Sequence, residues 1–219
     1  MAHPFFTIGH STLAIDDFVG LLRQAPVQLV VDVRTIPRSR TNPQYNSDAL
    51  RQTLSAFQVR YTHIAALGGL RGHTPGVAAS VNAFWNNQSF HNYADYAMTD
   101  TFRAGLDELQ ELGHAQPCAV MCAEAVWWRC HRRIIADYLI AAGETVLHVL
   151  PGGRIKAAES TPTATSGPGG TLVYPGVVAT RVSGSTASAC SQNSARGHIV
   201  ISTSADHTRL PNFEILKAM

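Results

Sequence analysis

Short runs of apolar residues alternate along this chain with longer segments in which apolar positions recur every three or four residues. The apolar runs are 4–9, 27–33, 59–64, 117–121 and 145–150. The run at 27–33 (VQLVVDV) is almost continuously β-branched, which is typical of a strand covered on both faces. The spacing of three to four between the runs is typical of amphipathic helices. Strands that alternate with helices pair in parallel through right-handed crossovers.

This pattern predicts an α/β fold with an open, mostly parallel, doubly wound sheet and helices on both faces. An aromatic-rich stretch between the third and fourth runs, residues 79–113, is predicted to be a helical insertion that forms a lid or a side wall. We expect this single α/β domain to occupy residues 1–175, with an edge strand at 172–175.

The composition changes after residue 155. Between residues 160 and 204, 16 of 45 residues are Ser or Thr, mixed with Gly, Ala and Pro, and such segments bury too little apolar surface to fold. We therefore expect residues 176–219 to be a poorly ordered C-terminal extension rich in Ser, Thr, Gly and Ala, apart from a short strand at 198–201.

Composition and charge exclude several classes of protein. The formal net charge is +2, so no strong overall field attracts the chain to nucleic acid or membranes, and anion binding requires a local basic cluster. No apolar run is long enough to span a membrane. The four cysteines lack the pattern of a secreted disulfide framework, and the N-terminus lacks the features of a signal peptide. We expect a cytoplasmic protein with no membrane partner.

Polar residues and glycines follow all five predicted strands. In open parallel sheets, ligands bind beyond the carboxyl ends of the strands, so these residues are expected to lie along one edge. They are, in chain order, His10 and Ser11, Arg34, Gly68 and Gly69 with Arg71, Cys122 and Glu124, and Gly152 and Gly153. This convergence predicts a functional site at that edge.

Residues 121–132 (MCAEAVWWRCHR) contain the two candidate reactive cysteines. Cys122 is expected to end its strand at an exposed turn. Cys130 is expected near the start of the next helix, where unpaired N–H groups and the helix dipole favour the thiolate. The alternative is that both are small buried hydrophobes, which is common for free cysteine.

The same segment offers groups that could move protons. Glu124 could act as a general acid or base if Trp127 or Trp128 removes it from water and raises its pKa. His131 could do the same, although its spacing from Ile135 also fits a half-buried structural histidine.

A second cluster follows the strand at 27–33. Asp32 is the one charge within that run and could orient Arg34, and Arg38 and Arg40 lie on the proline-stiffened loop beyond it. Arginines in this setting suit a phosphate or a carboxylate. Arg38 and Arg40 fit a solvated surface loop equally well.

Two glycine-containing turns could receive a ligand. His10 and Ser11 follow Gly9 at a strand-to-helix turn, where helix amides can bind an anion, although a simple helix cap at Ser11 is the plainer interpretation. Gly68 and Gly69 allow a backbone to approach a ligand closely.

Several motifs in fixed order resemble those of a known family. They are TIGHS at 7–11, DVR at 32–34, PRS at 37–39, LGG at 67–69, YADY at 93–96, MCAE at 121–124 and CHR at 130–132. On these motifs the chain is similar to the family called domain of unknown function 488, over about residues 4–175. The resemblance implies the fold and the location of the site, but no reaction.

The leading hypothesis is an enzyme that acts on a small anionic or nucleotide-like substrate. Arg34 and Arg132 would hold the anion, and Cys122 or Cys130 would supply the thiol. By analogy alone, the order strand, cysteine, loop and helix is similar to that of thiol phosphatases and sulfurtransferases.

Two alternatives remain. The first is a non-catalytic nucleotide or nucleic-acid binding module, whose salt-dependent binding would use Arg34, Arg38, Arg40 and Arg71. The second is a metal-binding protein that uses Cys122, Cys130 and His131, although the spacing lacks the paired CxxC of structural zinc sites. The predicted site residues include no metal ligand. The sequence does not identify a cofactor or an oligomeric state.

Overall fold

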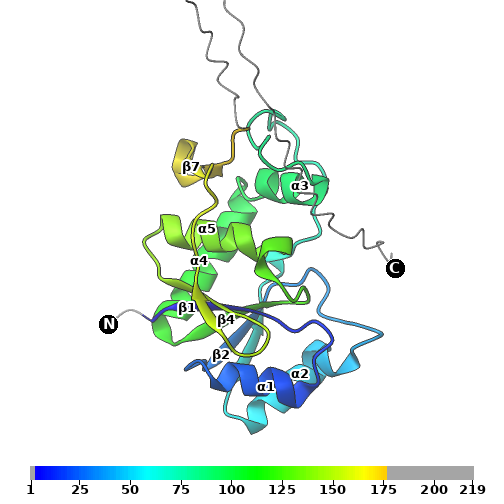
Figure 1. Cartoon of the computed structure of the whole chain (residues 1–219). Coiled ribbons are helices and arrows are strands. Elements are labelled where there is room, and N and C mark those ends of the chain that lie inside the picture. Colours follow the sequence, from blue (N-terminus) through cyan, green and yellow to red (C-terminus); the bar gives the residue numbers. More distant parts are fainter. Residues whose placement is uncertain (1–2, 177–219) are drawn as a thin grey trace, which may run out of the picture. The chain divides into compact units, whose positions relative to one another are not determined.

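A mostly parallel sheet forms the centre of the computed structural model, which describes residues 3–176 (Figure 1). The strand order is β3-β2-β4-β1-β5-β6. Neighbouring strands are parallel from β3 to β5, and β6 is antiparallel to β5. The strands are β1 (Phe5–Gly9), β2 (Leu29–Asp32), β3 (Arg60–His63), β4 (Cys118–Cys122), β5 (Val146–Val149) and β6 (Ile155–Ala157). The predicted α/β fold is confirmed.

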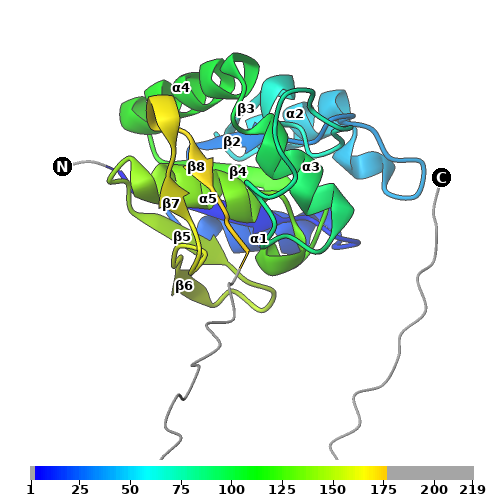
Figure 2. The ribbon, with the colours of Figure 1, turned by 90° about the horizontal axis from the view of Figure 1, so that it is seen from above.

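Helices cover both faces of this sheet. The helices are α1 (Ile15–Arg23), α2 (Ser47–Ala56), α3 (Gln88–Tyr96), α4 (Asp100–Ala115) and α5 (Arg132–Ala141). α1 and α2 lie on one face, whereas α4 and α5 lie on the other (Figures 1 and 2). Because successive strand residues point to opposite faces, Phe6 and Ile8 of β1 join the core under α1 and α2, whereas Phe5 joins the other core. Because helices cover both faces of the sheet, strand residues that point to either face are buried, which explains the nearly continuous apolar runs.

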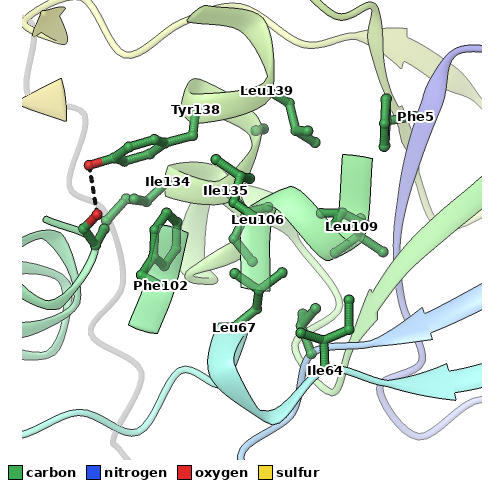
Figure 3. Packing of buried hydrophobic residues seen from close by; sticks show 14 of the residues in the cluster. Phe5, Ile64, Leu67, Phe102, Leu106, Leu109, Ile134, Ile135, Tyr138 and Leu139 are labelled. Atoms are coloured by element: carbon green, nitrogen blue, oxygen red, sulfur yellow. Dashed lines mark hydrogen bonds between the residues drawn. The ribbon is translucent and has the colours of Figure 1, made fainter. Parts of the chain in front are cut away.

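The core under α4 and α5 also holds the segment that follows β3. Figure 3 shows Ile64 and Leu67 in this core, in one cluster with Leu109 of α4 and Leu139 of α5. Leu67 ends the short 3-10 helix η2 (Ala65–Leu67). This packing fixes the start of the loop that contains Gly68 and Gly69.

The predicted helical insertion is present, but its first part is not helical. Residues 79–84 form turns, and α3 begins only at Gln88. Tertiary contacts explain the difference, because the Asn82 side chain donates to Asp95 Oδ1 (2.7 Å) and accepts from the Tyr174 amide (3.0 Å). Asn87 then caps α3, its Oδ1 accepting from the Ser89 amide at 2.9 Å.

The prediction that residues 172–175 form an edge strand of the main sheet is wrong. Leu172–Val173 (β8) pairs with Thr165–Ser166 (β7) in a separate two-stranded sheet, and β6, which was not predicted, forms the edge of the main sheet. The segment is held against α5 instead, because the Leu172 amide donates to the Tyr138 hydroxyl and the Tyr174 hydroxyl donates to Asp137 Oδ2, both at 3.0 Å.

The expected C-terminal extension, residues 176–219, lies outside the described residues except for Gly176, and so does the strand expected at 198–201. Within residues 3–176, no helix has the length and apolar character needed to cross a membrane.

The two central strands, β1 and β4, create the crevice that positions the site. They are paired so that Gly9 lies opposite Cys122, yet α1, which follows β1, and α5, which follows β4, contribute to cores on opposite faces. The chain therefore leaves two adjacent strand ends in opposite directions, and such a switch point is where α/β sheets bind ligands. Beyond the strands, the His10 amide still donates to Cys122 O at 3.0 Å.

Candidate functional site

Four residues at the end of β4 and the start of α5 form what we call the sulfur cluster: Cys122, Cys130, His131 and Arg132. His131 Nδ1 lies 3.9 Å from Cys122 Sγ and 3.6 Å from Cys130 Sγ. Arg132 Nε donates to Cys130 Sγ at 3.2 Å. The 3-10 helix η3 (Trp127–Arg129) shortens the connection between the two cysteines. Two thiols, an imidazole and a guanidinium thus share one place in the fold.

The imidazole of His131 is held from three sides. Its Nε2 lies 3.0 Å from the carbonyl oxygen of Val33, just beyond β2. Its ring centroid is 4.9 Å from that of the buried Tyr93. A Cβ atom at Gly69 would lie 2.4 Å from Nδ1. Any other residue at this position would therefore displace the imidazole ring.

Arg132 is buried, with only 1% of its surface exposed. Besides Cys130, it donates to the backbone carbonyl of Glu124. A Cβ atom at Gly9 would lie 1.9 Å from that same carbonyl oxygen, which explains the glycine at this strand end. In the part of the chain that the structure describes, no carboxylate forms an ion pair with Arg132. The sulfur of Cys130 is therefore the group placed to balance its charge.

The two cysteines differ in their protonation. Burial raises the pKa of Cys130, but the hydrogen bond from the Cys122 thiol and the positive charge of Arg132 lower it, and the pKa of Cys130 lies well below its ordinary value. The pKa of Cys122 lies well above its ordinary value, because its thiol donates to Cys130 and because it is buried. These opposite shifts favour the thiolate form at Cys130 and the thiol form at Cys122.

A second group of residues, which we call the arginine network, lies beside the sulfur cluster: His10, Asp32, Arg34, Tyr45 and Tyr61. Arg34 donates from Nε to Asp32 Oδ1 (2.9 Å) and from Nη2 to Asp32 Oδ2 (2.6 Å), and Nη2 also reaches Tyr45 O at 2.7 Å. The Tyr61 hydroxyl donates to Asp32 Oδ2 at 2.7 Å. Both charges are buried, and each is paired with the other.

His10 completes the arginine network as a neutral imidazole. Its Nδ1 lies 2.8 Å from the carbonyl oxygen of Ser11, so Nδ1 carries the proton, and its Nε2 lies 3.3 Å from Arg34 Nη1. The ring stacks on Tyr45 with a centroid distance of 3.9 Å. Burial and the charge of Arg34 lower the pKa of His10 to about 4.

Other residues predicted for the site have different contacts. Arg71 donates from Nε to Gly68 O (2.8 Å) and from Nη2 to Ala65 O (2.7 Å), and its guanidinium lies 3.9 Å from the ring centroid of Tyr96. It thus holds the end of η2. A Cβ atom at Gly68 would lie 2.7 Å from the Thr35 side chain, so this glycine allows close packing. Arg38 and Arg40 are exposed.

Glu124 and Ser11 take part mainly through their backbones. Glu124 is half-buried, and its carbonyl holds Arg132. Trp127, one of the two tryptophans considered as a cover for the Glu124 carboxyl, stacks on His148 at a centroid distance of 4.4 Å. The helix cap expected at Ser11 is wrong, because α1 starts at Ile15 with Ala14 at the cap position. The Ser11 amide donates to Ala123 O at 2.9 Å and continues the ladder of β1 and β4.

Sequence reasoning missed His148, which lies beside the sulfur cluster on β5. Its Nδ1 and Thr7 Oγ1 form a hydrogen bond of 2.7 Å. Burial, followed by the charges of Arg132 and Lys156, lowers the pKa of His148 to about 4. A signal was present, because His148 is the one polar residue in the buried run VLHV, and a buried polar group requires a partner.

Comparison with known proteins gives a family and no function. No curated protein and no solved structure matches the chain. The model of one family, described as "Domain of unknown function DUF488", matches residues 14–139. This range includes Asp32, Arg34 and all four residues of the sulfur cluster, whereas the TIGHS motif at 7–11 lies outside it. Since the match spans more than half of the sequence, the chain belongs to the family of domain of unknown function 488.

Proposed function

We propose that the protein is a thiol-dependent enzyme, in which Cys130 is the nucleophile and Cys122 and His131 move protons beside it. The observation that carries the proposal is the contact of 3.2 Å between Arg132 Nε and Cys130 Sγ. A buried guanidinium without a carboxylate partner requires an anion, and a thiolate supplies one. Nucleophilic cysteines are activated in this way, by neighbouring cationic groups and helix N-termini.

The substrate class follows from the charges around the sulfur. Arg132 and the N-terminal turn of α5 favour a substrate with negative charge near its reacting atom. Cys122 is 9% exposed and Cys130 is 3% exposed, so the nucleophile is reached from the side of Cys122 and of the half-buried His131. We therefore propose a small anionic electrophile as the substrate.

The reaction needs two proton movements. As Cys130 Sγ forms its bond to the electrophilic atom, the bond to the leaving group breaks, and the leaving group takes the proton of the Cys122 thiol. A water molecule can then attack the thiol-bound group while the Cys122 thiolate, or Nδ1 of His131, accepts its proton. The hydrogen bond from Nε2 to Val33 O keeps the lone pair of Nδ1 facing both sulfurs.

Nucleotide binding without catalysis has less support. Two of its four proposed arginines donate to the protein itself, because Arg34 binds Asp32 and Arg71 binds backbone carbonyls. Arg38 and Arg40 are exposed and would be available to a phosphate. A reducing compartment such as the cytoplasm would keep both thiols of the sulfur cluster reduced.

Thiol alkylation tests the proposal. The test uses the Cys190→Ser variant after its metal has been removed with a chelator. Iodoacetamide is added at about pH 7, and the modified cysteines are identified by mass spectrometry. A thiolate reacts far faster than a thiol, so Cys130 is expected to react at least about tenfold faster than Cys118. Cys118 is the matched control, because it is buried in β4 and burial raises its pKa to about 12.

Hydrolysis of small anionic electrophiles, such as aryl phosphates, is then measured in the same background. Activity that is lost in Cys130→Ser and kept in Cys118→Ser supports the proposal. If Cys130 reacts as slowly as Cys118, the sulfur is not an activated thiolate and the proposed function is wrong.

A further inference from the structure

The hydrogen bond of His131 to the backbone fixes which of its nitrogens faces the sulfurs as an acceptor. Nε2 lies 3.0 Å from Val33 O, and a carbonyl oxygen only accepts, so Nε2 carries a proton. In the neutral imidazole the lone pair then lies on Nδ1. Nδ1 is the atom that faces both Cys122 Sγ and Cys130 Sγ. Two sulfurs and one nitrogen lone pair therefore converge.

The distances from the nitrogen to the two sulfurs are close to the edges of a tetrahedral metal site. Zn²⁺ holds thiolate sulfur at about 2.3 Å and imidazole nitrogen at about 2.0 Å, which separates tetrahedral ligands by about 3.5–3.8 Å. The nitrogen lies 3.6 Å and 3.9 Å from the two sulfurs, and all three atoms lie within 4.8 Å of one another. Only small side-chain shifts are needed for a common ion.

The surroundings supply what metal ligands need. Metal-binding histidines usually donate their second N–H to a carbonyl or carboxylate, which orients the ring, and Val33 O does this here. Arg132 Nε donates to Cys130 Sγ at 3.2 Å and can hold this sulfur as a thiolate. The ligands lie at the end of β4 and the start of α5, which are rigid elements. Gly69 has no side chain to fill the space beside Nδ1.

We propose that Cys122 Sγ, Cys130 Sγ and His131 Nδ1 bind a thiophilic divalent cation such as Zn²⁺, with a fourth position left for water or a small ligand. The proton of the Cys122 thiol leaves to solvent as the cation binds, since sulfur ligates as thiolate. Two thiolates carry more negative charge than Arg132 balances, so the cation neutralises the remainder. The binding stands independently of the proposed function. Its consequence rests on that function: bound Cys130 is no longer a free nucleophile, so the cation regulates the site.

The test uses Co²⁺ as a spectroscopic substitute for Zn²⁺. The full chain in the Cys190→Ser background, without an affinity tag and kept reduced, is titrated with Co²⁺ alone. We expect one equivalent to bind, with the charge-transfer absorption of thiolate ligands and the visible bands of a tetrahedral ion. Zn²⁺ is expected to displace it, because zinc is bound more tightly than cobalt at such sites.

Variants assign the ligands. Cys122→Ser, Cys130→Ser and His131→Gln are each expected to weaken Co²⁺ binding by more than about 100-fold. Loss of a group that only orients a metal ligand already costs about 10–100-fold. Cys118→Ser removes a buried cysteine of the same strand and is expected to bind as the parent does. Circular dichroism identifies the folded variants, and a single folded ligand variant is sufficient. Binding that is absent from the parent, or equally strong in the folded ligand variants, overturns the inference.

A combined experiment separates this inference from the proposed function. Bound Zn²⁺ is expected to protect Cys130 from iodoacetamide, and a chelator is expected to restore its reaction. Rapid alkylation without cation binding contradicts the metal site alone. Cation binding with slow alkylation of the metal-free protein contradicts the thiol enzyme alone.

Discussion

Two buried arginines lie at the same edge of the sheet, and they differ in their partners. Arg34 in the arginine network is 6% exposed and forms a two-point ion pair with Asp32. Arg132 in the sulfur cluster is 1% exposed and donates to a sulfur and a backbone carbonyl. The first arginine is satisfied by an unreactive carboxylate, whereas the second depends on the Cys130 sulfur, which we propose as a nucleophile and a metal ligand.

This difference teaches how buried charge can be used for two purposes. A buried ion pair adds little net stability but is costly to break, because one charge is then left unpaired. The arginine network therefore acts as a brace between β2, β3 and the loop that contains Tyr45. In the sulfur cluster, we propose that the same requirement favours the thiolate form of Cys130. Four predictions follow from this contrast, in order of decreasing effect.

The largest expected effect is the loss of the carboxylate that pairs with Arg34. Asp32→Asn leaves this guanidinium without an anion, and breaking a buried pair costs about 3–5 kcal/mol of unfolding free energy. Urea denaturation measures the change. Asp48→Asn, at an exposed position in the first turn of α2, is the control and is expected to cost less than about 1 kcal/mol. Equal losses in the two variants would contradict the bracing role.

Mild acid is expected to destabilise both regions through their buried histidines. His10 and His148 each have a pKa lowered from 6.5 to about 4. The unfolded chain therefore binds more protons between these values. The unfolding free energy falls as the pH drops through this window, by up to about 1.4 kcal/mol per pH unit for each histidine.

Denaturation curves from pH 7 to pH 4 measure this slope. His10→Gln is expected to remove the contribution of one histidine, which makes the slope of unfolding free energy against pH shallower. His73 is exposed, and His73→Gln is the control for the loss of an imidazole. The charged groups involved are Asp32, Arg34 and Arg132 around His10, and Arg132 and Lys156 around His148. A slope that His10→Gln leaves unchanged would show that His10 is not neutral in the folded protein.

The charge of Arg132 is expected to set the reactivity of Cys130. Arg132→Gln should raise the pKa of the thiol, and at about pH 7 the alkylation of Cys130 should slow by about tenfold for each unit by which this pKa then exceeds the pH. Arg132→Lys keeps the charge and should restore part of the rate. Arg34→Lys should lower the unfolding free energy but leave the alkylation rate of Cys130 within about twofold of the parent's rate. A rate that responds equally to both arginines would remove the distinction between the two regions.

The smallest expected effect compares two glycines. Gly20 lies inside α1 with no atom within 4 Å of the Cβ it lacks, so Gly20→Ala should raise the unfolding free energy by about 0.5–1 kcal/mol. Gly69→Ala should give no such gain, because its Cβ would lie 2.4 Å from Nδ1 of His131. Thermal unfolding compares them, and a stabilised Gly69→Ala would show that the imidazole is freer than its contacts indicate.

The sequence predicts the sheet well, because its information is local. Runs such as 27–33 contain the β-branched residues of a strand with two buried faces, and β2 lies within that run. The edge of the sheet was harder to predict. β6 has three exposed residues, so no apolar pattern marks it, and the pairing of β8 with β7 depends on contacts with Tyr138 and Asp137 of α5.

The site was predicted as a list of residues but not as an arrangement. The rule that ligands bind at strand ends found Cys122, His10 and Arg34. It could not show that Arg34 is paired within the protein, because the geometry of Asp32 and Tyr45 depends on the fold. A metal site at Cys122, Cys130 and His131 stayed an alternative, because the spacing lacks a paired CxxC. The sequence could not show that the His131 ring is oriented by Val33 O, which is 98 residues away.

The segment between the two cysteines has a practical consequence. It contains Trp127 and Trp128, two of the three tryptophans in the chain, and Trp127 stacks on His148. Indole emission depends on such neighbours, so a shift of this segment during alkylation or cation binding would change the intrinsic fluorescence. Events at the sulfurs could then be followed in real time in the unlabelled protein, with light absorbed by its own side chains.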